Sequence, residues 1–149
     1  MKKDQLDLFR SLKTFQLMTV AAMGEGRGEV VEGRIAICCV IRNRVNAKSW
    51  YGNTYHEVIL KDKQFSCFNE DDPNLEYCVS LARMITASAD PVVRETKLIA
   101  LGVISDVIQD RTKGATHYFS LLGKKPKWVA TMKLKGLIGD HAFYKEERA

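Results

Sequence analysis

Hydrophobic residues near the start of the chain recur at the spacing of a helix. Between Leu6 and Met23 they return every three or four positions, as one buried stripe requires: Leu8, Phe9, Leu12, Phe15, Met18 and Ala22. Three glycines follow at alternate positions, Gly24, Gly26 and Gly28. Glycine weakens a helix by about 1 kcal/mol relative to alanine and readily adopts the left-handed C-cap conformation. The pattern therefore predicts one helix that ends at the glycine string.

The next apolar segment, residues 29–45, is hydrophobic on most sides and predicts a central buried helix. Its many β-branched residues leave a strand possible, although Arg42 and Arg44 suit a helix C-terminus. Thr54 and Glu57 form a capping-box pattern that opens a short helix through Ile59. Residues 64–68 are expected to form a strand or a turn.

Two more helices are predicted, over residues 75–87 and 91–109, the second with Asp90 as its N-cap and Pro91 at its first position. After Asp110 the helical periodicity is lost among glycines, aromatics and lysines. This part predicts loops and short strands packed on the helices. At 149 residues we expect a single domain, residues 1–149, of the α+β class and mainly α.

Composition narrows the classes of function. Hydrophobic residues make up 46% and charged residues 28%, which is the balance of a packed globular protein. The net charge of +5 favours an anionic partner. Basic residues are scattered apart from five lysines near the end, Lys124, Lys125, Lys127, Lys133 and Lys135. Because no nucleic-acid reading motif accompanies them, we do not expect nucleic-acid binding.

Cysteine usage and the N-terminus indicate where the protein is made. The four cysteines show no CxxC spacing, and Cys38 and Cys39 lie inside an apolar run, so we interpret them as reduced packing residues. The first residues lack the apolar stretch and cleavage site of a signal peptide, and no segment approaches the roughly 18 apolar residues of a membrane span. We therefore expect synthesis in the cytoplasm, with action elsewhere only after a membrane breach or delivery.

Glu25 and Glu29 are the strongest candidates for chemistry. Glu25 ends one predicted helix, where the helix dipole and partial burial disfavour an ionised carboxylate, whereas Glu29 begins the next, near Arg27 and Arg34, and should stay ionised. Two carboxylates with such divergent proton affinities are typical of acid catalysis of glycoside cleavage. From spacing alone, two solvated helix-end glutamates are an equally good interpretation.

Other catalytic classes find little support. A cysteine peptidase or amidase would need Cys67 with His117 or His56 as its base, and no local signature accompanies them. The three histidines lack the HExxH spacing of a zinc hydrolase, so no metal and no cofactor are expected. A binding protein without activity remains the main alternative to an enzyme.

Several ordered strings resemble the SleB-type cell wall hydrolases, the family of spore-cortex-lytic enzymes. They are Gly24-Glu25-Gly26-Arg27-Gly28-Glu29, Gly33, Asn43-Arg44-Val45, Val58-Ile59, Gln64-Phe65-Ser66, Gly114-Ala115-Thr116-His117-Tyr118, Pro126 with Trp128, and Ile138-Gly139-Asp140-His141-Ala142-Phe143-Tyr144. The resemblance implies a lysozyme-like fold with a small β wing. It also implies cleavage between N-acetylmuramic acid and N-acetylglucosamine, with Glu25 as the acid and a 1,6-anhydro ring as the product. Hydrolysis by water is the alternative outcome.

The same strings supply candidate substrate-binding residues. Glu29, Gln64, Ser66, His117, Tyr118 and Trp128 are expected to line a sugar groove, although packing in the core is the alternative for each aromatic, amide, hydroxyl or imidazole. His141 is expected to make structural hydrogen bonds. The predicted partner is bacterial peptidoglycan. A phage endolysin or virion-borne lysin is the expected setting, with a holin or virion proteins as further partners.

Overall fold

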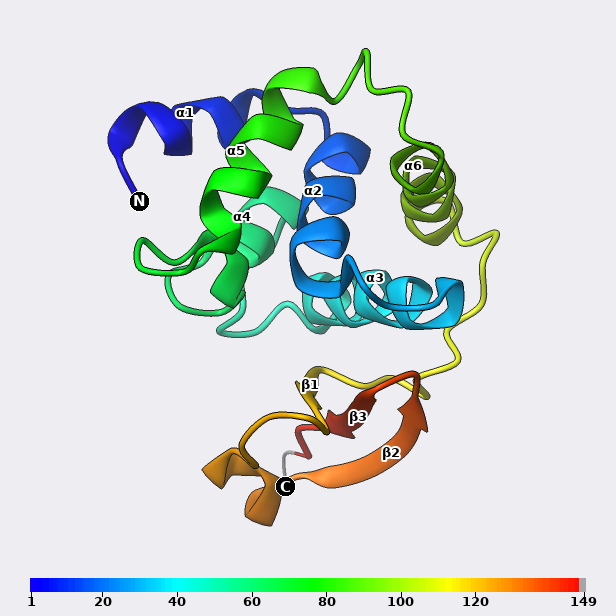
Figure 1. Cartoon of the computed structure of the whole chain (residues 1–149). Helices are drawn as coiled ribbons and strands as arrows, with labels where there is room; N and C mark the ends of the chain where they lie inside the picture. The colour runs from blue at the N-terminus through cyan, green and yellow to red at the C-terminus, as the bar shows by residue number, and fades with distance from the viewer. Residues whose placement is uncertain (148–149) are drawn as a thin grey trace.

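The computed structural model describes residues 1–147, and its helices form one body above a small sheet (Figure 1). In chain order the elements are α1 (Lys3–Ser11), α2 (Thr14–Gly26), α3 (Val31–Ala47), α4 (Tyr55–Leu60), the 3-10 helix η1 (Ser66–Phe68), α5 (Asn74–Met84), α6 (Pro91–Ile104), β1 (His117–Ser120), the 3-10 helix η2 (Lys127–Thr131), β2 (Lys133–Ile138) and β3 (His141–Lys145). The predicted class is confirmed: the chain is mainly α, with one small antiparallel sheet.

The prediction of one helix from Leu6 to Met23 is wrong, because the chain leaves helical geometry at Leu12 and Lys13. Both residues have extended backbones, and Gln16 accepts the Lys13 N–H at 2.9 Å, which caps the start of α2. The hydrophobic spacing continues across the break because Leu12 is itself buried. Periodicity therefore could not locate it.

Helix α2 is buried on all sides rather than along one stripe. Every residue from Leu17 to Gly24 is buried, and the helix contacts α3, α4, α5 and α6, which surround it in Figure 1. Helix α3, predicted to be central, is indeed a helix with a largely buried middle. Burial of these apolar side chains, each contributing about 1.5–3 kcal/mol, is the main source of stability of the helical body.

The glycines at 24, 26 and 28 do not form the expected left-handed cap. Helix α2 continues through Gly26, and the glycines with a positive φ are Gly52, Gly114 and Gly139. Close packing explains two of the three: a Cβ on Gly24 would lie 2.6 Å from Cys78 Sγ, and one on Gly26 would lie 2.7 Å from Ile37 Cδ1. The string lets neighbouring elements approach α2 closely around Glu25.

Two of the later helices, α4 and α6, begin at the predicted caps, whereas α5 and α6 end sooner than predicted, at Met84 and Ile104. Thr54 accepts the Glu57 N–H and Asp90 accepts the Val92 N–H, so both N-caps are confirmed. Helix α6 ends at Ile104 instead of Gln109, because the N–H groups of Val107 and Ile108 turn back to the Gly102 carbonyl. Residues 66–68 form a 3-10 turn, which was one of the two expected outcomes.

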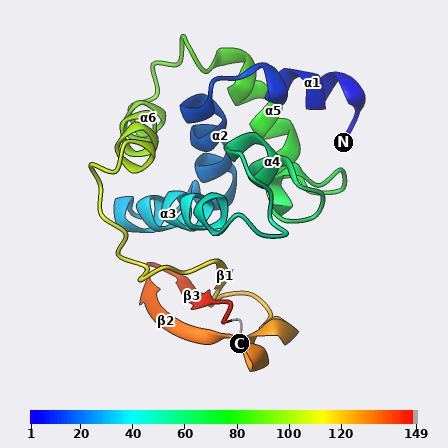
Figure 2. The ribbon, with the colours of Figure 1, turned by 180° about the vertical axis from the view of Figure 1, so that it is seen from behind.

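The sheet, which we call the wing, lies below α3 in both views (Figures 1 and 2). Its order is β1-β3-β2, with Tyr118 opposite Phe143 and Phe119 opposite Ala142. The inner face therefore carries Tyr118, His141, Phe143 and Ile138, and Phe143 packs on Ala36 and Val40 of α3. The outer face carries His117, Phe119 and Tyr144, with Leu134 and Leu137 opposite Tyr144 and Ala142.

The connection from α6 to the wing is anchored by Asn43 and Asp110. Asn43 Nδ2 donates to Asp110 Oδ2 at 2.8 Å and to the Ala115 carbonyl at 2.9 Å, and Asp110 also accepts from Thr112 and Gly114. Burial acts to raise the pKa of Asp110, but the hydrogen bonds from Thr112 and Asn43 prevail and lower it. These bonds hold the loop against α3. They give Asn43, in the string Asn43-Arg44-Val45, a structural role.

The cysteines are buried packing residues. Cys38, Cys39, Cys67 and Cys78 are all free and fully buried, as predicted. Within residues 1–147, the helices are too short or too polar for any of them to cross a bilayer.

Candidate active site

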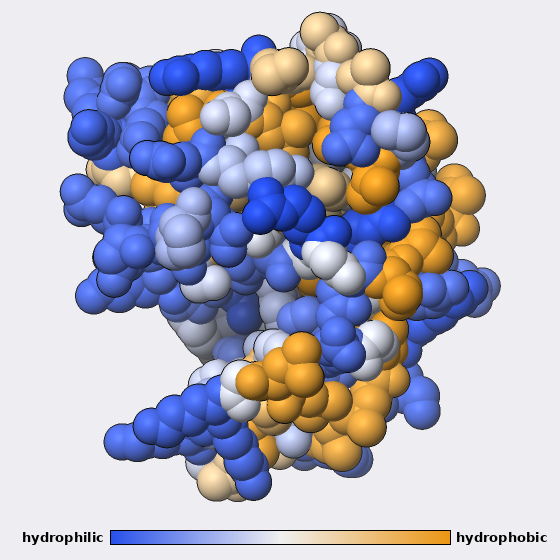
Figure 3. Space-filling view, viewed as in Figure 1, coloured by the Kyte–Doolittle hydropathy of each residue, from blue (hydrophilic) through white to orange (hydrophobic). Residues whose placement is uncertain are grey.

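The Glu25 carboxylate lies where the helical body meets the wing. Tyr118 Oη donates to Oε1 at 2.9 Å, while Ser66 Oγ and the Cys67 N–H both donate to Oε2 at 3.2 Å. Tyr118 belongs to β1, and the other two donors belong to η1. The molecular surface is hollowed between the helices and the wing in Figure 3. A half-buried carboxylate with three donors is thus held at the junction of both parts.

Gly24 makes this arrangement possible from the helix side. A Cβ there would lie 2.8 Å from Cys67 Sγ and 2.6 Å from Cys78 Sγ, so only glycine lets η1 and α5 pack this closely on α2. The close approach brings the Cys67 amide to the side chain of the next residue, Glu25.

Tyr118 keeps its hydroxyl proton and can therefore donate it in a hydrogen bond to Glu25. Burial and the negative charge of Glu25, to which it is hydrogen-bonded, raise the pKa of Tyr118 well above 10. Its ring is fixed by Phe143 and His141, with ring centroids 5.7 and 5.3 Å away. Because the hydroxyls of Tyr118 and Ser66 can accept as well as donate, the carboxyl group can be hydrogen-bonded with or without its proton.

Arg44 of α3 contacts the residues that flank the candidate site. The sequence did not predict this role. Its guanidinium is buried, and Nε donates to the Thr116 carbonyl at 2.7 Å, just before β1. The same group lies 5.1 and 5.2 Å from the ring centroids of Tyr51 and Phe65. Nη1 also contacts Gln64 Oε1 at 3.4 Å, so Gln64 is held by α3 at the edge of η1. A single cation therefore joins α3, the segment before η1 and the wing.

Burial lowers the pKa of Arg44, while Tyr118, Tyr51 and Glu25 act to raise it. The position of an arginine inside the run Ile41 to Val45 predicted a helix end and nothing more. Only the packing of the wing on α3 reveals that this side chain faces the candidate site.

Glu29 lies just before α3, in contact with the turn between β2 and β3. Its Oε1 is 2.6 Å from His141 Nδ1 and accepts the Asp140 N–H at 3.2 Å. The side chain is only 8% exposed, and a Cβ on Gly139 or Gly33 would lie 2.3 or 2.9 Å from its Oε2. Glu29 thus fastens the wing to the start of α3. The expected hydrogen-bonding role of His141 is confirmed.

The expected cationic neighbours of Glu29 lie elsewhere. Arg34 binds Glu95 and Thr96 on α6, and the Arg27 guanidinium stacks 4.0 Å from the Tyr77 ring centroid. Contact of Glu29 with a substrate stays a prediction.

Replacing Glu29 by Gln is expected to lower the free energy of unfolding by about 1.5 to 3 kcal/mol, the usual contribution of hydrogen bonds to a charged group. Cleavage should fall less than for a change at Glu25, because Tyr118 still reaches Glu25 in the folded fraction. Urea unfolding followed by circular dichroism measures the change. Glu32→Gln, in the exposed first turn of α3, is the matched control and should cost no more than about 0.3 to 1 kcal/mol, the effect of one charge at a helix start. Equal stability of both variants would contradict the fastening role.

His117 and Trp128 lie in an aromatic cluster on the other face of the wing. The ring centroid of His117 is 5.1 Å from that of Trp128 and 5.9 Å from that of Tyr51, and Trp128 also packs on Tyr144 at 5.4 Å. His117 Nδ1 is 3.0 Å from Thr116 Oγ1. Both residues therefore close the packing between the wing and the loop after α3, and their contact with sugars stays a prediction.

Burial and the positive charge of Arg44 lower the pKa of His117 to about 4 from 6.5. The unfolded chain therefore takes up a proton below about 6.5 that the folded chain refuses until about 4, so stability falls as the pH drops through this window. In urea titrations, the wild type should lose more stability between pH 7 and about pH 4.5 than His117→Gln. The same loss in both proteins would contradict this origin.

The structure brings some of the predicted residues together and separates others. Ser66 and Tyr118 contact Glu25 directly, and Gln64 lies beside them through Arg44. Glu29, His117 and Trp128 belong to contacts that hold the wing. The Cys67 amide was also missed, because a backbone donor leaves no trace in residue type.

The competing catalytic classes gain nothing from the geometry. A hydrogen bond between Cys67 and Cys78, together with burial, raises the pKa of the Cys67 thiol strongly, which opposes a nucleophilic thiolate. His117 contacts Thr116, and His56 contacts the Leu12 carbonyl. Among residues 1–147, His, Cys, Asp and Glu nowhere gather in the groups of three that could hold a metal ion.

A pocket of about 720 Å³ lies away from Glu25, between α1 and the segment 60–71. Its walls combine apolar residues such as Leu6 and Phe68 with Lys61 and Asp71. Glu25, Ser66, Cys67 and Tyr118 are not among the residues that line this pocket. The candidate active site is therefore identified by the hydrogen-bonded carboxylate and not by the volume of a pocket.

The fold matches two solved catalytic domains. The catalytic domain of the germination-specific lytic transglycosylase SleB from Bacillus anthracis is 28% identical, with a TM-score of 0.67, and the match covers 89% of this chain and 93% of that one. The catalytic domain of the Bacillus cereus SleB protein is 29% identical, also with a TM-score of 0.67, and the match covers 89% of each chain.

Curated relatives agree with these structures. The spore cortex-lytic enzyme of Bacillus cereus is 32% identical over 138 residues, which are 91% of this chain and 45% of that protein. The enzyme of Halalkalibacterium halodurans is 30% identical over 128 residues, 86% of this chain and 33% of that protein. The chain thus spans less than half the length of these relatives. The cell wall hydrolase family model matches residues 28–144, so the chain belongs to the cell wall hydrolase family.

Proposed function

We propose that this chain cleaves the glycan strands of peptidoglycan between N-acetylmuramic acid and N-acetylglucosamine, with Glu25 as the acid. The observation that carries the proposal is the Glu25 carboxylate, held by Tyr118, Ser66 and the Cys67 amide where the helical body meets the wing. Membership of the cell wall hydrolase family supports the substrate, although the matched range begins after Glu25.

In the proposed reaction, protonated Glu25 donates its proton to the glycosidic oxygen as the bond to muramic acid C1 breaks. The C6 hydroxyl of the same muramic acid then attacks C1 and closes a 1,6-anhydro ring. The Glu25 carboxylate takes up the proton that this hydroxyl releases, so the acid is restored. The donors on Glu25 hold its two oxygens in place through both steps.

Ring closure needs one carboxyl group, whereas a retaining hydrolase needs a second carboxylate as nucleophile. The nearest acidic residue in sequence, Glu29, is nearly buried and already bound by His141 and Asp140. This supports transglycosylation over a two-carboxylate mechanism. The solved relative named a lytic transglycosylase supports the same choice.

Gln64 and Ser66 are proposed to bind the N-acetyl groups and hydroxyls of the substrate. Ser66, at the start of η1, is exposed and donates to Glu25, and Gln64 lies two residues earlier in the chain and contacts Arg44. Amide and hydroxyl groups at the rim of a cleft can donate to and accept from sugar substituents. Glu29, His117 and Trp128 are proposed to act on the substrate through the position of the wing. A phage lysin role, with a holin or virion proteins as partners, stays a prediction.

Mass spectrometry of digested peptidoglycan tests the reaction. We expect fragments that end in 1,6-anhydro-muramic acid and intact peptide stems. Reducing muramic ends would indicate hydrolysis by water instead. Absence of any cleaved glycan, with binding to the wall retained, would favour the alternative of a wall-binding protein without activity.

Tyr118→Phe is expected to slow cleavage by about 10- to 100-fold, because it removes a hydrogen bond to a charged group at the reacting centre. Stability should change little, since the ring keeps its contacts with Phe143 and His141. Initial rates on purified peptidoglycan measure the effect. Tyr77→Phe, a half-buried tyrosine on α5 outside the site, is the control. A folded Tyr118→Phe protein with the wild-type rate would remove the tyrosine from its role.

A further inference from the structure

The outer side of the wing exposes large apolar side chains. Leu134 and Leu137 lie on the outer face of β2 and are 52% and 63% exposed, and Leu121 and Leu122, in the turn after β1, are 49% and 84% exposed. We call these four residues the wing leucines. Figure 3 shows hydrophobic atoms gathered on the wing. Exposed apolar patches of this kind mark interaction sites.

The wing leucines are displayed by ordered backbone rather than by a loose loop. The Leu121 N–H donates to the Asp140 carbonyl at 2.7 Å, and the Leu122 N–H donates to Ser120 Oγ at 3.2 Å. The turn after β1 is therefore hydrogen-bonded both to the turn between β2 and β3 and to the last residue of β1. These two bonds hold the backbone of the turn in the conformation that exposes both leucines.

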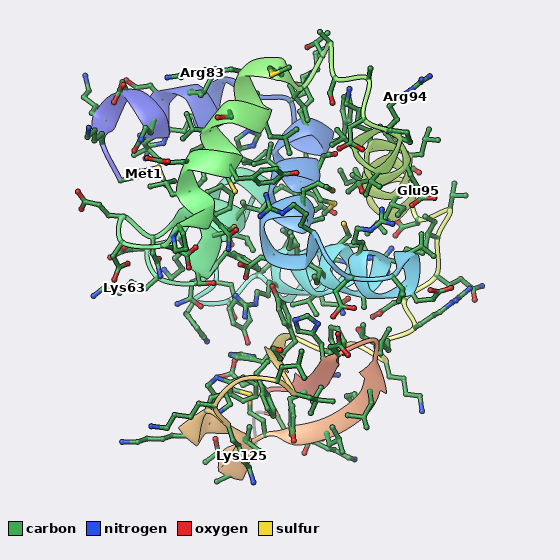
Figure 4. All side chains as sticks on the ribbon, viewed as in Figure 1. Met1, Lys63, Arg83, Arg94, Glu95 and Lys125 are labelled. Atoms are coloured by element: carbon green, nitrogen blue, oxygen red, sulfur yellow. The ribbon has the colours of Figure 1, made fainter. Side chains whose placement is uncertain are left out.

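The segment of the chain that carries the wing leucines is rich in lysine. Residues 117–138 contain five lysines and no Asp or Glu: Lys124, Lys125, Lys127, Lys133 and Lys135. Lys125 projects from the end of the wing away from the helical body (Figure 4). Lys133 lies 3.8 Å from Glu147 in an exposed pair, which contributes little. The segment is thus both apolar and cationic, with exposed Asp140 beside Leu121 as an acidic neighbour.

We propose that the outer side of the wing docks on an anionic phospholipid surface. Lysine stems lie along the headgroups with their ammonium groups on phosphate, while the leucines enter the boundary of the acyl chains. A second copy of this chain fits poorly, because the same five cations would face each other. A polyanion in solution would use the lysines but gains nothing from four exposed leucines.

Docking in this orientation leaves the candidate active site free. Tyr118, which binds Glu25, lies on the inner face of the sheet, whereas Leu134 and Leu137 lie on the outer face. Docking by the outer face would therefore leave the face of the sheet that bears Tyr118 uncovered. This inference depends on the wing surface alone and not on the reaction assigned to Glu25.

Vesicle sedimentation tests the proposal. The full chain is mixed with vesicles of equal parts phosphatidylglycerol and phosphatidylcholine, or of phosphatidylcholine alone. We expect binding to the anionic vesicles and little to the neutral ones. Lys124→Gln/Lys125→Gln should weaken binding by about 30-fold, and Leu121→Ser/Leu122→Ser by at least about tenfold.

Matched controls separate a site from general charge. Lys61→Gln/Lys63→Gln removes the same charge from the helical body, and Leu98→Ser changes a leucine that is 70% exposed on α6. Both should bind like the wild type, and all variants should keep the wild-type melting temperature. Equal weakening by the two lysine pairs, or wild-type binding by Leu121→Ser/Leu122→Ser, would overturn the proposal. So would self-association that disappears in the leucine variant.

Discussion

Glu25→Gln is expected to reduce peptidoglycan cleavage by about 100- to 10,000-fold, the usual contribution of a general acid. The amide keeps the shape of the side chain and still accepts a hydrogen bond from the Cys67 amide, but it cannot deliver a proton. Loss of turbidity of a wall suspension gives the rate, and circular dichroism verifies the fold.

Glu76→Gln, on the exposed first turn of α5, is the matched control and should cleave like the wild type. If a folded Glu25→Gln protein retained a near wild-type rate, Glu25 would not be the acid. If Glu29→Gln were the inactive variant instead, the roles of the two glutamates would be reversed.

Arg44→Leu is expected to lower the free energy of unfolding by about 3 kcal/mol, because it strands the buried Thr116 carbonyl and removes a charge-assisted hydrogen bond. For a chain of this size that corresponds to a melting temperature roughly 6 to 12 °C lower. Cleavage by the folded fraction should fall as well, since β1 and Gln64 lose their common support. Scanning calorimetry and initial rates measure the two effects.

Arg27→Leu tests whether any arginine beside an aromatic ring behaves this way. Arg27 is exposed and stacks on Tyr77, so its loss should cost well under 1 kcal/mol. Similar melting temperatures for Arg44→Leu and the wild type would show that the buried cation does not join the wing to α3.

Sequence patterns located the helices better than their ends. Caps with their own side-chain chemistry, such as Thr54 and Asp90, could be read directly. The break at Leu12 could not, because a buried residue in an extended segment keeps the hydrophobic spacing. The glycines near Glu25 were assigned to a turn, whereas they permit close packing against Cys67, Cys78 and Ile37, which are distant in sequence.

The candidate site was predicted only as far as residue types in strings allow. Glu25, Ser66 and Tyr118 were named in advance and do meet. The sequence predicts that the Glu29 carboxylate lies near an arginine. In the structure it contacts His141 instead, more than a hundred positions later in the chain. Arg44 stands in one of the strings, but its role depends on the packing of the wing on α3, and the Cys67 amide has no marker in sequence because every residue type except proline has a backbone N–H.

The three donors to Glu25 come from two parts of the molecule, and this divides the site between them. The helical body supplies the carboxylate, Ser66 and the Cys67 amide, and the wing supplies Tyr118. Neither part contains a complete constellation. Exchange of wings between members of the family would therefore require the matching contacts from α3 and the residues before it, above all those of Arg44 and Glu29. A chimera without these contacts would not bring Tyr118 to Glu25.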